Sequence, residues 1–262
     1  MSQRIPLSWL QLKHEKMKLF AAVSGVMVSV VLMWMQLGLL KALFASAVVF
    51  HGALDGELIV IHSQYEHLLH SKPYSSRLLY RLRGSPDVQD VFSIYVQMAE
   101  WKSPWNGEVR SIQCYGVETE APSLNLPGFA EQVQELRKTD VFLYDRVGRP
   151  RFGNVVAASE RNELIEPEIN RRRMTLTGLI DLGASFGADG NILVSHANFL
   201  RLFPVRKPGA IDVGVVKLKP GVSVETAQHT FQELLGKEVR VLTRDEFKEV
   251  ELFYWKAATP IG

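Results

Sequence analysis

A cluster of three histidines and a carboxylate, His62, Glu66, His67 and His70, has the side chains that bind zinc in proteins. The spacing of His67 and His70 would place both of them on one face of a helix. However, the order H-x-x-x-E-H differs by one residue from the H-x-x-E-H pattern of inverted zinc proteases. A solvated surface cluster is therefore the favoured interpretation, and we expect neither a metal nor any other cofactor.

Two further segments have features of a binding site for an anion or a partner. Arg171, Arg172 and Arg173 present guanidinium forks that suit lipid headgroups or partner carboxylates, although an exposed strand end is the simpler interpretation. Residues 183–190 (GASFGADG) have the glycine content of a phosphate-binding loop. A strand-like NILV follows them, so no helix N-terminus is there to bind an anion. We expect a loop that exposes Phe186.

Known catalytic motifs are absent from the sequence. It has no G-x-x-x-x-G-K-[ST] phosphate loop, no G-x-S-x-G elbow, no H-E-x-x-H and no Cys-x-x-Cys. The 30 Lys and Arg residues nearly balance the 28 Asp and Glu residues, which argues against a nucleic-acid-binding protein. The single cysteine, Cys114, cannot form an internal disulfide. The sequence therefore predicts a protein that is not an enzyme.

A membrane anchor is predicted over Leu19–Leu40, which contains no charged side chain and spans roughly 33 Å, enough for a bilayer core of about 30 Å. The apolar region of a signal peptide is shorter, about 7–15 residues, so we expect the segment to be retained. The residues before it carry a net charge of +3, whereas acids outnumber bases by 27 to 25 after Lys41. The positive-inside rule therefore predicts a plasma (inner) membrane protein whose N-terminus is cytoplasmic and whose residues after about 41 are periplasmic.

Small and polar residues form a stripe on this predicted helix. Ala21, Gly25 and Ser29 repeat every four residues, and Gln36 lies close to the same face. Small side chains let a second membrane helix approach closely, and a glutamine can hydrogen-bond across the contact. Chance explains the stripe equally well, because small residues are common in membrane helices. On the first interpretation these four residues are helix-packing positions.

Helical character continues beyond the anchor until Gly52 and the pair Asp55-Gly56 supply stop signals. A helix over Leu19–Leu54 would be about 54 Å long, so about 20 Å of it would project from the membrane as a stalk. On the other side of the anchor, Ile5–Leu12 is typical of a short segment that lies on the cytoplasmic membrane surface.

Beyond the stalk the pattern changes to mixed α and β, with one β-α-β unit at each end of the region. The first unit has Ser75 as its helix cap. The second has a strand over Val213–Leu218 that ends at the Pro220-Gly221 turn, a helix from its cap Ser223 to Gly236, and a returning strand to Leu242. The section between them contains short strands and Gly- or Pro-rich turns, with few helices other than those expected at Phe129–Leu136 and Ala197–Phe203. The expected fold is a membrane-anchored α+β protein, with one N-terminal transmembrane helix and stalk, then an α/β subdomain split by a β-rich insertion.

The last predicted helix begins at a capping box, Thr243–Glu246, and carries Phe247, Val250 and Tyr254 at helical spacing. Trp255 beside Lys256 is typical of a membrane interface, so we expect a second membrane helix to begin there. The predicted segments are a cytoplasmic interfacial segment (1–18), the transmembrane helix and stalk (19–54), the α/β subdomain in two halves (55–104 and 211–252), the β-rich insertion (105–210) and the start of the second membrane helix (253–262).

Several segments resemble the DevC permeases of cyanobacteria, part of the MacB/FtsX/LolC-like group of ABC transporter membrane subunits. They cover nearly the whole chain in order: IPLSWLQLKHEK, LMWMQLG, LTGLIDLGASFGADGNILVS, NFLRLFP, IDVGVVKLKPG, RVLTRDEF and YWKAATPIG. The resemblance implies four membrane helices and a periplasmic domain between the first two, in which a porter-like α/β subdomain carries a β-rich insertion. This chain ends at Gly262, and we expect it to be truncated before the second membrane helix.

The resemblance also implies partners. Such permeases work as homodimers in membrane lipid with a cytoplasmic ABC ATPase subunit, a periplasmic adaptor (membrane fusion protein) and a TolC-like outer-membrane duct, and DevC is associated with export of heterocyst envelope glycolipids. The expected function is that of the permease subunit, which couples ATP hydrolysis elsewhere to periplasmic movements that expel a lipid or amphiphile. Arg171, Arg172, Arg173 and Phe186 are then candidate adaptor contacts. A single-pass sensor or scaffold with a periplasmic binding domain is the alternative, and a metal-dependent hydrolase is a distant third.

Overall fold

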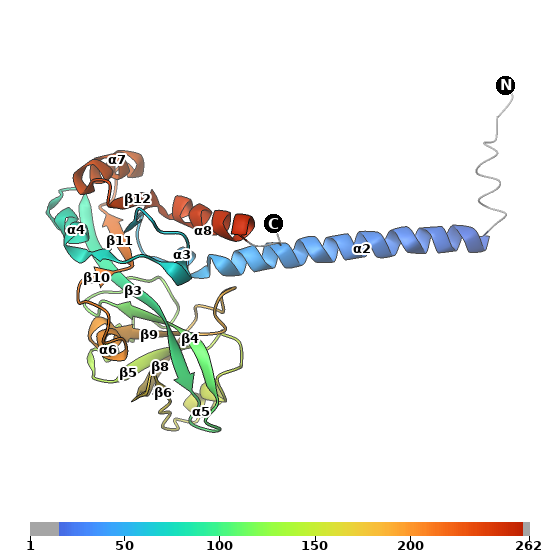
Figure 1. Ribbon diagram of the computed structural model, residues 1–262, viewed down its shortest axis with the longest axis horizontal. Coiled ribbons are helices and arrows are strands. Elements are labelled where there is room, and N and C mark those ends of the chain that lie inside the picture. Colours follow the sequence, from blue (N-terminus) through green and yellow to red (C-terminus); the bar gives the residue numbers. More distant parts are fainter. Residues whose placement is uncertain (1–15, 259–262) are drawn as a thin grey trace. The chain divides into compact units, whose positions relative to one another are not determined.

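The computed structural model describes residues 16–258, so the predicted surface segment Ile5–Leu12 and the last residues, 259–262, lie outside the described chain. The chain divides into two compact units, residues 1–43 and residues 44–262. The described part of the first unit is helical, and the second, which we call the folded unit, is a mixed α/β structure (Figure 1).

Helix α2 spans Lys16–Ala47, and its length and composition are sufficient to cross a membrane. The predicted unbroken helix to Leu54 is wrong, because a turn at Val48 (φ −111°, ψ 15°) separates α2 from α3, Val49–Ala53. Adjacent valines do not explain this turn by themselves, because Val30 and Val31 lie inside the unbroken part of α2. Helix α3 is instead held by the burial of Phe50, His51 and Ala53 in the folded unit. The stalk therefore consists of two helical segments.

The folded unit contains twelve strands in the part of the chain that is described. They are β1 (Leu58–His62), β2 (Tyr74–Ser75), β3 (Val88–Lys102), β4 (Val109–Val117), β5 (Val141–Asp145), β6 (Glu168–Ile169), β7 (Arg172–Arg173), β8 (Thr175–Ile180), β9 (Asn191–Ser195), β10 (Ala210–Ile211), β11 (Val213–Leu218) and β12 (Val239–Thr243). The helices are α4 (Ser76–Tyr80), α5 (Val155–Glu160), α6 (His196–Leu202), α7 (Val224–Leu235) and α8 (Arg244–Ala258), with 3-10 turns η1 (Leu68–His70), η2 (Arg81–Gly84) and η3 (Val133–Arg137).

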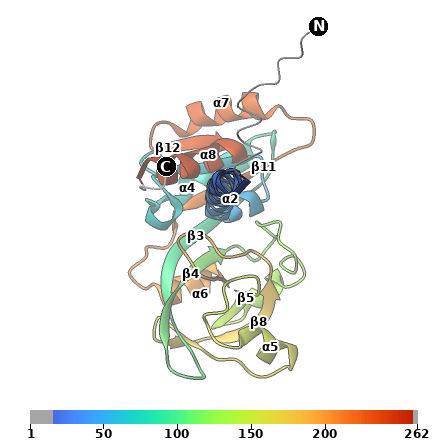
Figure 2. The same cartoon turned by 90° about the vertical axis from the view of Figure 1, so that its right-hand side faces the viewer.

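One ten-stranded sheet runs through the whole folded unit in the order β12-β1-β11-β3-β4-β9-β5-β8, with β6 and β7 attached beside β3. Strand β3 is long because it serves both halves of the sheet. Its first part pairs with β11, and its second part pairs with β4 and β6. Figure 2 shows these halves, one with α7 and α8 and the other with β4, β5, β8 and α5.

Helices cover both faces of the first half of the sheet. Alternation along β1 explains why: Leu58 and Val60 belong to the core shared with α4 and α7, whereas Ile59 and Ile61 belong to the core shared with α3 and α8. Helix α7 begins at Ser223, whose hydroxyl accepts a hydrogen bond from Thr226 N at 3.3 Å, as a capping residue should. Both predicted β-α-β units are therefore present.

The second half of the sheet packs around Trp101, which lies on β3 and is fully buried. Its ring centroid lies 5.7 Å from those of Phe142 and Tyr144 and 5.8 Å from that of Phe152. This half is rich in strands, as predicted for the insertion. Because β3 belongs to both halves, the subdomain boundaries at 104/105 and 210/211 stay a prediction.

Two predicted helices are shorter than expected. Ser75 precedes α4 without a side-chain capping hydrogen bond, and after five residues the helix tightens into η2. The helix predicted over 129–136 is only the 3-10 turn η3. Gly128, at the start of the predicted helix, has a φ of +80°, which is not helical. The Gln132 side chain donates hydrogen bonds to the backbone oxygens of Gly128 and Leu179, which holds this segment in a non-helical turn.

Candidate functional site

Helix α8 begins at the capping box that the sequence predicts. Thr243 N donates to Glu246 Oε2 at 2.7 Å, and Glu246 N donates to Thr243 Oγ1 at 3.2 Å. From this fixed start Phe247 and Glu251 fall one helical turn apart on the same face. Both are buried on the side of α8 that faces α3. The capping box therefore sets which residues of α8 enter the core.

Glu251 is a buried carboxylate, with its side chain only 2% exposed. Its Oε2 accepts hydrogen bonds from Tyr65 Oη at 2.8 Å and from Leu68 N at 2.9 Å, and its Oε1 accepts one from Trp255 Nε1 at 2.9 Å. A buried charge is tolerated only with such partners. The carboxylate thus ties α8 to the loop that leads into η1.

His51 brings α3 into the same contact. Its Nε2 lies 3.4 Å from Glu251 Oε2, and its ring centroid lies 4.3 Å from that of Phe247. Burial raises the pKa of Glu251, but His51, Trp255 and Tyr65 act in the opposite direction and leave that pKa below its ordinary value. Glu251 is therefore ionised at neutral pH, and its charge joins α3 and α8, two helices of the folded unit that are far apart in the sequence.

This contact predicts an acid-sensitive fold. A carboxyl whose pKa is lower in the folded than in the unfolded state stabilises the fold above its ordinary pKa of 4.5, and that contribution is lost as the pH falls through the folded value. We expect the free energy of unfolding to decrease below about pH 4.5 and the Glu251→Gln variant to lose part of this dependence. Urea titrations followed by tryptophan fluorescence measure it, and an equally steep acid dependence in the variant would contradict the assignment.

The predicted solvated histidine cluster is partly buried. His67 is only 5% exposed, and its ring stacks on Tyr254 of α8 with centroids 4.1 Å apart. Burial lowers the pKa of His67, so the ring is neutral at neutral pH and packs as an aromatic group. His62 Nδ1 accepts a hydrogen bond from Gln64 N at 3.0 Å. Among residues 16–258, no group of three or more His, Cys, Asp or Glu side chains is placed to hold a metal ion.

The glycine-rich segment 183–190 is a loop followed by strand β9, as predicted. Asp145, buried at the end of β5, fixes its start by accepting hydrogen bonds from Leu182 N at 3.0 Å and Gly183 N at 2.9 Å. Phe186 is half-buried, which differs from the exposed position expected. Its ring meets Trp255 of α8 edge-on, with centroids 4.6 Å apart. The loop therefore contacts the same helix that carries Glu251.

The three arginines lie at the hairpin turn between β6 and β7, where Arg171 is exposed with a φ of +64°. Arg172 forms an ion pair with Asp140 at 3.4 Å, and Arg173 forms one with Glu166 at 3.9 Å. Such surface pairs are weak, so an incoming acidic group can compete for the guanidinium groups. Neither the histidine cluster nor Phe186 lies at this turn. The role of the three arginines in partner contact stays a prediction.

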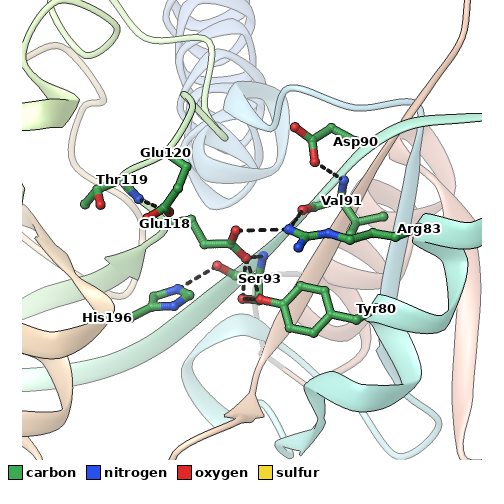
Figure 3. A network of polar contacts seen from close by, with 9 residues as sticks. All are labelled: Tyr80, Arg83, Asp90, Val91, Ser93, Glu118, Thr119, Glu120 and His196. Atoms are coloured by element: carbon green, nitrogen blue, oxygen red, sulfur yellow. Dashed lines mark hydrogen bonds and ion pairs between the residues drawn. The ribbon is translucent and has the colours of Figure 1, made fainter.

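A second carboxylate, Glu118, lies just beyond the end of β4. Its Oε1 accepts hydrogen bonds from Tyr80 Oη and Ser93 N, both at 2.8 Å, and from Ser93 Oγ at 2.7 Å, while its Oε2 lies 3.5 Å from Arg83 Nη2 (Figure 3). His196 Nε2 lies 2.8 Å from the Ser93 carbonyl oxygen. Tyr80 and Arg83 lie on α4 and η2, which pack on the first half of the sheet. Glu118 and His196 lie beside β4 and on α6, in the second half. The network therefore joins the two halves.

Asp212, a fully buried carboxylate, lies between β10 and β11, where the chain returns to the first half of the sheet. Its Oδ1 accepts from Ser71 Oγ at 2.8 Å, and its Oδ2 accepts from Val96 N and Arg206 Nη2, both at 2.7 Å. Burial raises the pKa of Asp212, and the charge and hydrogen bond of Arg206 oppose that shift. Arg206 follows α6, so this pair fixes the end of the insertion to the sheet.

Comparison with known proteins relates the chain by fold. The structure is similar to the periplasmic region of MacB from Actinobacillus actinomycetemcomitans, with a TM-score of 0.52 and 13% identity over 76% of this chain and 94% of that chain. The folded unit has the fold of the MacB periplasmic region. A further similarity, with a TM-score of 0.47 and 12% identity over 71% of this chain and 98% of that chain, is to the extracellular domain of the noncanonic ABC-type transporter YknZ from Gram-positive bacteria. No family model and no curated protein matches the sequence.

The predicted fold class is confirmed. An apolar helix able to span a membrane precedes a mixed α/β unit with a strand-rich insertion, and that unit superimposes on the MacB periplasmic region.

The described chain also shows where the predicted helix-packing residues lie. Ala21, Gly25, Ser29 and Gln36 are all exposed on α2 and fall within an arc of about 80°. Ser29 Oγ donates to Gly25 O at 2.9 Å, which satisfies the hydroxyl within the helix.

The carboxylates at the centre of this MacB-like unit are not identified by the sequence analysis. Glu118 and Asp212 have no helix or strand periodicity to mark them, since most of their partners lie far away in the chain and Arg206, six residues before Asp212, lies in a loop. Glu251 does have a local signal in the sequence. It falls four residues after Phe247, on the apolar stripe of a helix whose start is fixed by the capping box. A charged residue on an apolar stripe is expected to have a buried partner.

Proposed function

We propose that this chain is the permease subunit of an ABC exporter, with its folded unit outside the plasma membrane. The observation that carries the proposal is the MacB periplasmic fold in a unit that follows a helix able to span a membrane. The resemblance of the sequence to DevC permeases supports the same assignment over nearly the whole chain. ATP would be hydrolysed by a separate cytoplasmic subunit.

The role of this chain in the proposal is mechanical. Helix α3 follows directly on α2, and α8 lies beside α3 on one face of the sheet. His51 and Glu251 connect these two helices, and Tyr65 and Trp255 complete the contact. A displacement of α3 would therefore move α8 and the sheet with it. The Glu118 network would pass the movement to the insertion.

The remaining partners follow from the same proposal. The permease would work as a homodimer in membrane lipid, with a periplasmic adaptor and a TolC-like outer-membrane duct, and would expel a lipid or amphiphilic substrate. Arg171, Arg172 and Arg173 are candidate adaptor contacts because Arg171 and Arg173 are exposed at the hairpin between β6 and β7, Arg172 is partly exposed there, and the ion pairs of Arg172 and Arg173 are weak. Phe186 is a weaker candidate, because Trp255 covers part of its ring.

Affinity purification of the tagged protein from detergent-solubilised native membranes tests the proposal, with mass spectrometry of the proteins recovered. We expect an ATPase with a phosphate loop and a periplasmic adaptor in stoichiometric amounts. If neither the ATPase nor the adaptor is recovered, in cells shown to contain the ATPase, the transporter assignment is contradicted. That outcome would favour the membrane-anchored sensor or scaffold.

Self-association through α2 is a testable part of the homodimer proposal. Gly25→Leu would place a bulky side chain at the centre of the small-residue stripe, and Gln36→Leu would remove an interhelical hydrogen bond of about 1 kcal/mol. We expect each substitution to lower Förster transfer between labelled copies in liposomes severalfold at limiting protein density. Val26→Leu, on the neighbouring face, is the matched control. Equal transfer in all three variants would show that the stripe does not mediate packing.

A further inference from the structure

Strand β12 ends the ten-stranded sheet on one side. It pairs antiparallel with β1, and within residues 16–258 no further strand pairs with its other side. Arg244 N donates to Glu57 O at 3.3 Å, and Ser63 N donates to Glu238 O at 2.8 Å. In an antiparallel pair such bonds recur at every second residue, so the backbone groups that turn outwards are those of residues 239, 241 and 243. A strand edge of this kind is a template on which another strand can pair.

Two glutamine side chains of α7, the helix beside β12 (Figure 1), cover this outer edge. Gln232 accepts a hydrogen bond from Val241 N at 2.8 Å through Oε1 and donates one to Val239 O at 3.0 Å through Nε2. Gln228, one helical turn earlier, donates to Val241 O at 3.0 Å. The capping box of α8 takes up the next outward N–H along the strand. The glutamines thus occupy the places that a neighbouring strand would take.

The hydrogen bonds explain why glutamine stands at both positions. Helix α7 packs on the sheet through the buried side chains of Ala227, Phe231 and Leu235. Gln228 and Gln232 lie next to this apolar row and are only partly buried. A primary amide has the same donor and acceptor groups as a peptide unit, so it can replace one residue of a paired strand. We call these two residues the edge-capping glutamines.

The edge that they cover is complementary to itself. Antiparallel pairing of two copies about Val241 would join outward-turned residues only, 239 with 243 and 241 with 241. Glu238 of each copy would then face Arg244 of the other, and Lys237 would face Asp245. All four of these residues are exposed, and opposite charges at facing positions stabilise a strand pair. A second copy of this chain is therefore the partner that an open β12 edge fits.

The strand itself has the composition of a segment that pairs readily. Residues 239–243, VRVLT, include three β-branched residues and a leucine, and no proline interrupts them. Its one charged side chain, Arg240, lies on the face of the strand and donates to Tyr65 O at 3.1 Å. Neither the composition of β12 nor a bulge in its register with β1 blocks its outer edge. The protection of this edge therefore depends on the side chains that cap it.

We propose that the edge-capping glutamines keep two copies of this chain from joining their sheets at β12. Without them each folded unit offers unpaired backbone groups, apolar side chains and complementary end charges to the same edge of a second copy. This role goes beyond the proposed function, because it concerns contacts within one folded unit and between two such units in any assembly. In the proposed homodimer, capped edges would leave the two folded units free to separate.

The opened-edge variant replaces both glutamines by alanine, Gln228→Ala with Gln232→Ala, in the full chain in detergent. Alanine is a good helix former, so we expect α7 to form and thermal unfolding to stay cooperative. Sedimentation velocity at rising protein concentration should show particles of at least twice the wild-type mass. The matched control, His229→Ala with Thr230→Ala, changes two exposed positions of the same helix and should sediment as the wild type does.

Charge reversal separates pairing at β12 from unspecific aggregation. Added to the opened-edge variant, Glu238→Arg would place like charges opposite each other at both ends of the paired strands, because it faces Arg244 of the second copy. We expect it to weaken the association about tenfold. Glu233→Arg makes the same change in charge at a position of α7 that is 73% exposed and does not face β12, so it should leave the association unchanged.

Two results would overturn the proposal. One is an opened-edge variant that sediments as the wild type does at every concentration. The other is an association that Glu238→Arg does not weaken, which would show aggregation through some other surface. If the double variant loses cooperative unfolding, Gln232→Ala alone replaces it in both measurements, because this change still frees Val241 N and Val239 O. None of these results depends on whether the ATPase is recovered in affinity purification.

Discussion

Replacing Glu251 by alanine is expected to destabilise the folded unit by about 3–5 kcal/mol, since breaking a buried charged contact costs this much. The substitution removes the acceptor for Tyr65 Oη, Leu68 N and Trp255 Nε1, and leaves His51 buried beside a cavity. Urea unfolding of the full chain in detergent, followed by tryptophan fluorescence, measures the loss. We expect Trp34 of α2 to change little in this signal, because an apolar helix should stay in the detergent micelle during the titration.

Glu249→Ala is the matched control for this prediction. It removes the same functional group from the same helix, but Glu249 is exposed, so the change in unfolding free energy should stay within about 0.5 kcal/mol. A loss in Glu251→Ala no larger than in the control would show that Glu251 does not hold α3 and α8 together. That result would contradict the proposed transfer of movement from α3 to α8 through Glu251.

The second large effect is expected at Arg206, where methionine preserves much of the side-chain volume but removes the charge. Asp212, fully buried, would lose its ion pair and one hydrogen bond, and the folded unit should lose about 3 kcal/mol of stability near neutral pH. The loss should depend on pH in a definite direction. Without Arg206, the pKa of folded Asp212 rises further above its ordinary value, so proton binding favours the folded state and the deficit shrinks as the pH is lowered towards about 5.

Arg201→Met is the control for this pair. Arg201 also contacts a carboxylate, Asp140, at 3.3 Å, but its side chain is 45% exposed, so a surface pair worth less than about 1 kcal/mol is lost. Urea midpoints at both pH values compare the two variants. A pH-independent deficit in Arg206→Met would show that Arg206 acts through packing on the rings of Tyr95 and Phe199 instead of through the charge of Asp212.

The sequence predicts those parts of the fold that depend on local signals. Strand β11 is predicted to the residue because its apolar run ends at the Pro220-Gly221 turn, and α7 is predicted from Ser223 to Gly236 because both ends carry capping residues. The capping box before α8 likewise forms as predicted. These features need no knowledge of distant residues.

Features set by tertiary contacts are harder to predict. The break at Val48 and the burial of His67 under Tyr254 depend on how α3 and α8 pack. The candidate site shows the same limit, because the residues that meet Glu251 come from positions 51, 65 and 68 as well as from α8 itself. The predicted contact residues on α2 and at the β6–β7 hairpin remain predictions, since their partners would be other chains.

The central claim is that ATP use by a partner subunit moves the folded units of two copies of this chain. Spin labelling at Glu233→Cys tests it most directly, because Glu233 is 73% exposed on α7 and the native Cys114 is fully buried with a raised pKa, so it will not react. Pulsed electron spin resonance on the complex purified with its ATPase should show a distance between the two labels that shifts when ATP and vanadate trap the ADP–vanadate state of the ATPase, and a smaller shift in Glu251→Gln. One unchanged distance distribution in every nucleotide state, or no measurable distance between labels, would contradict the account.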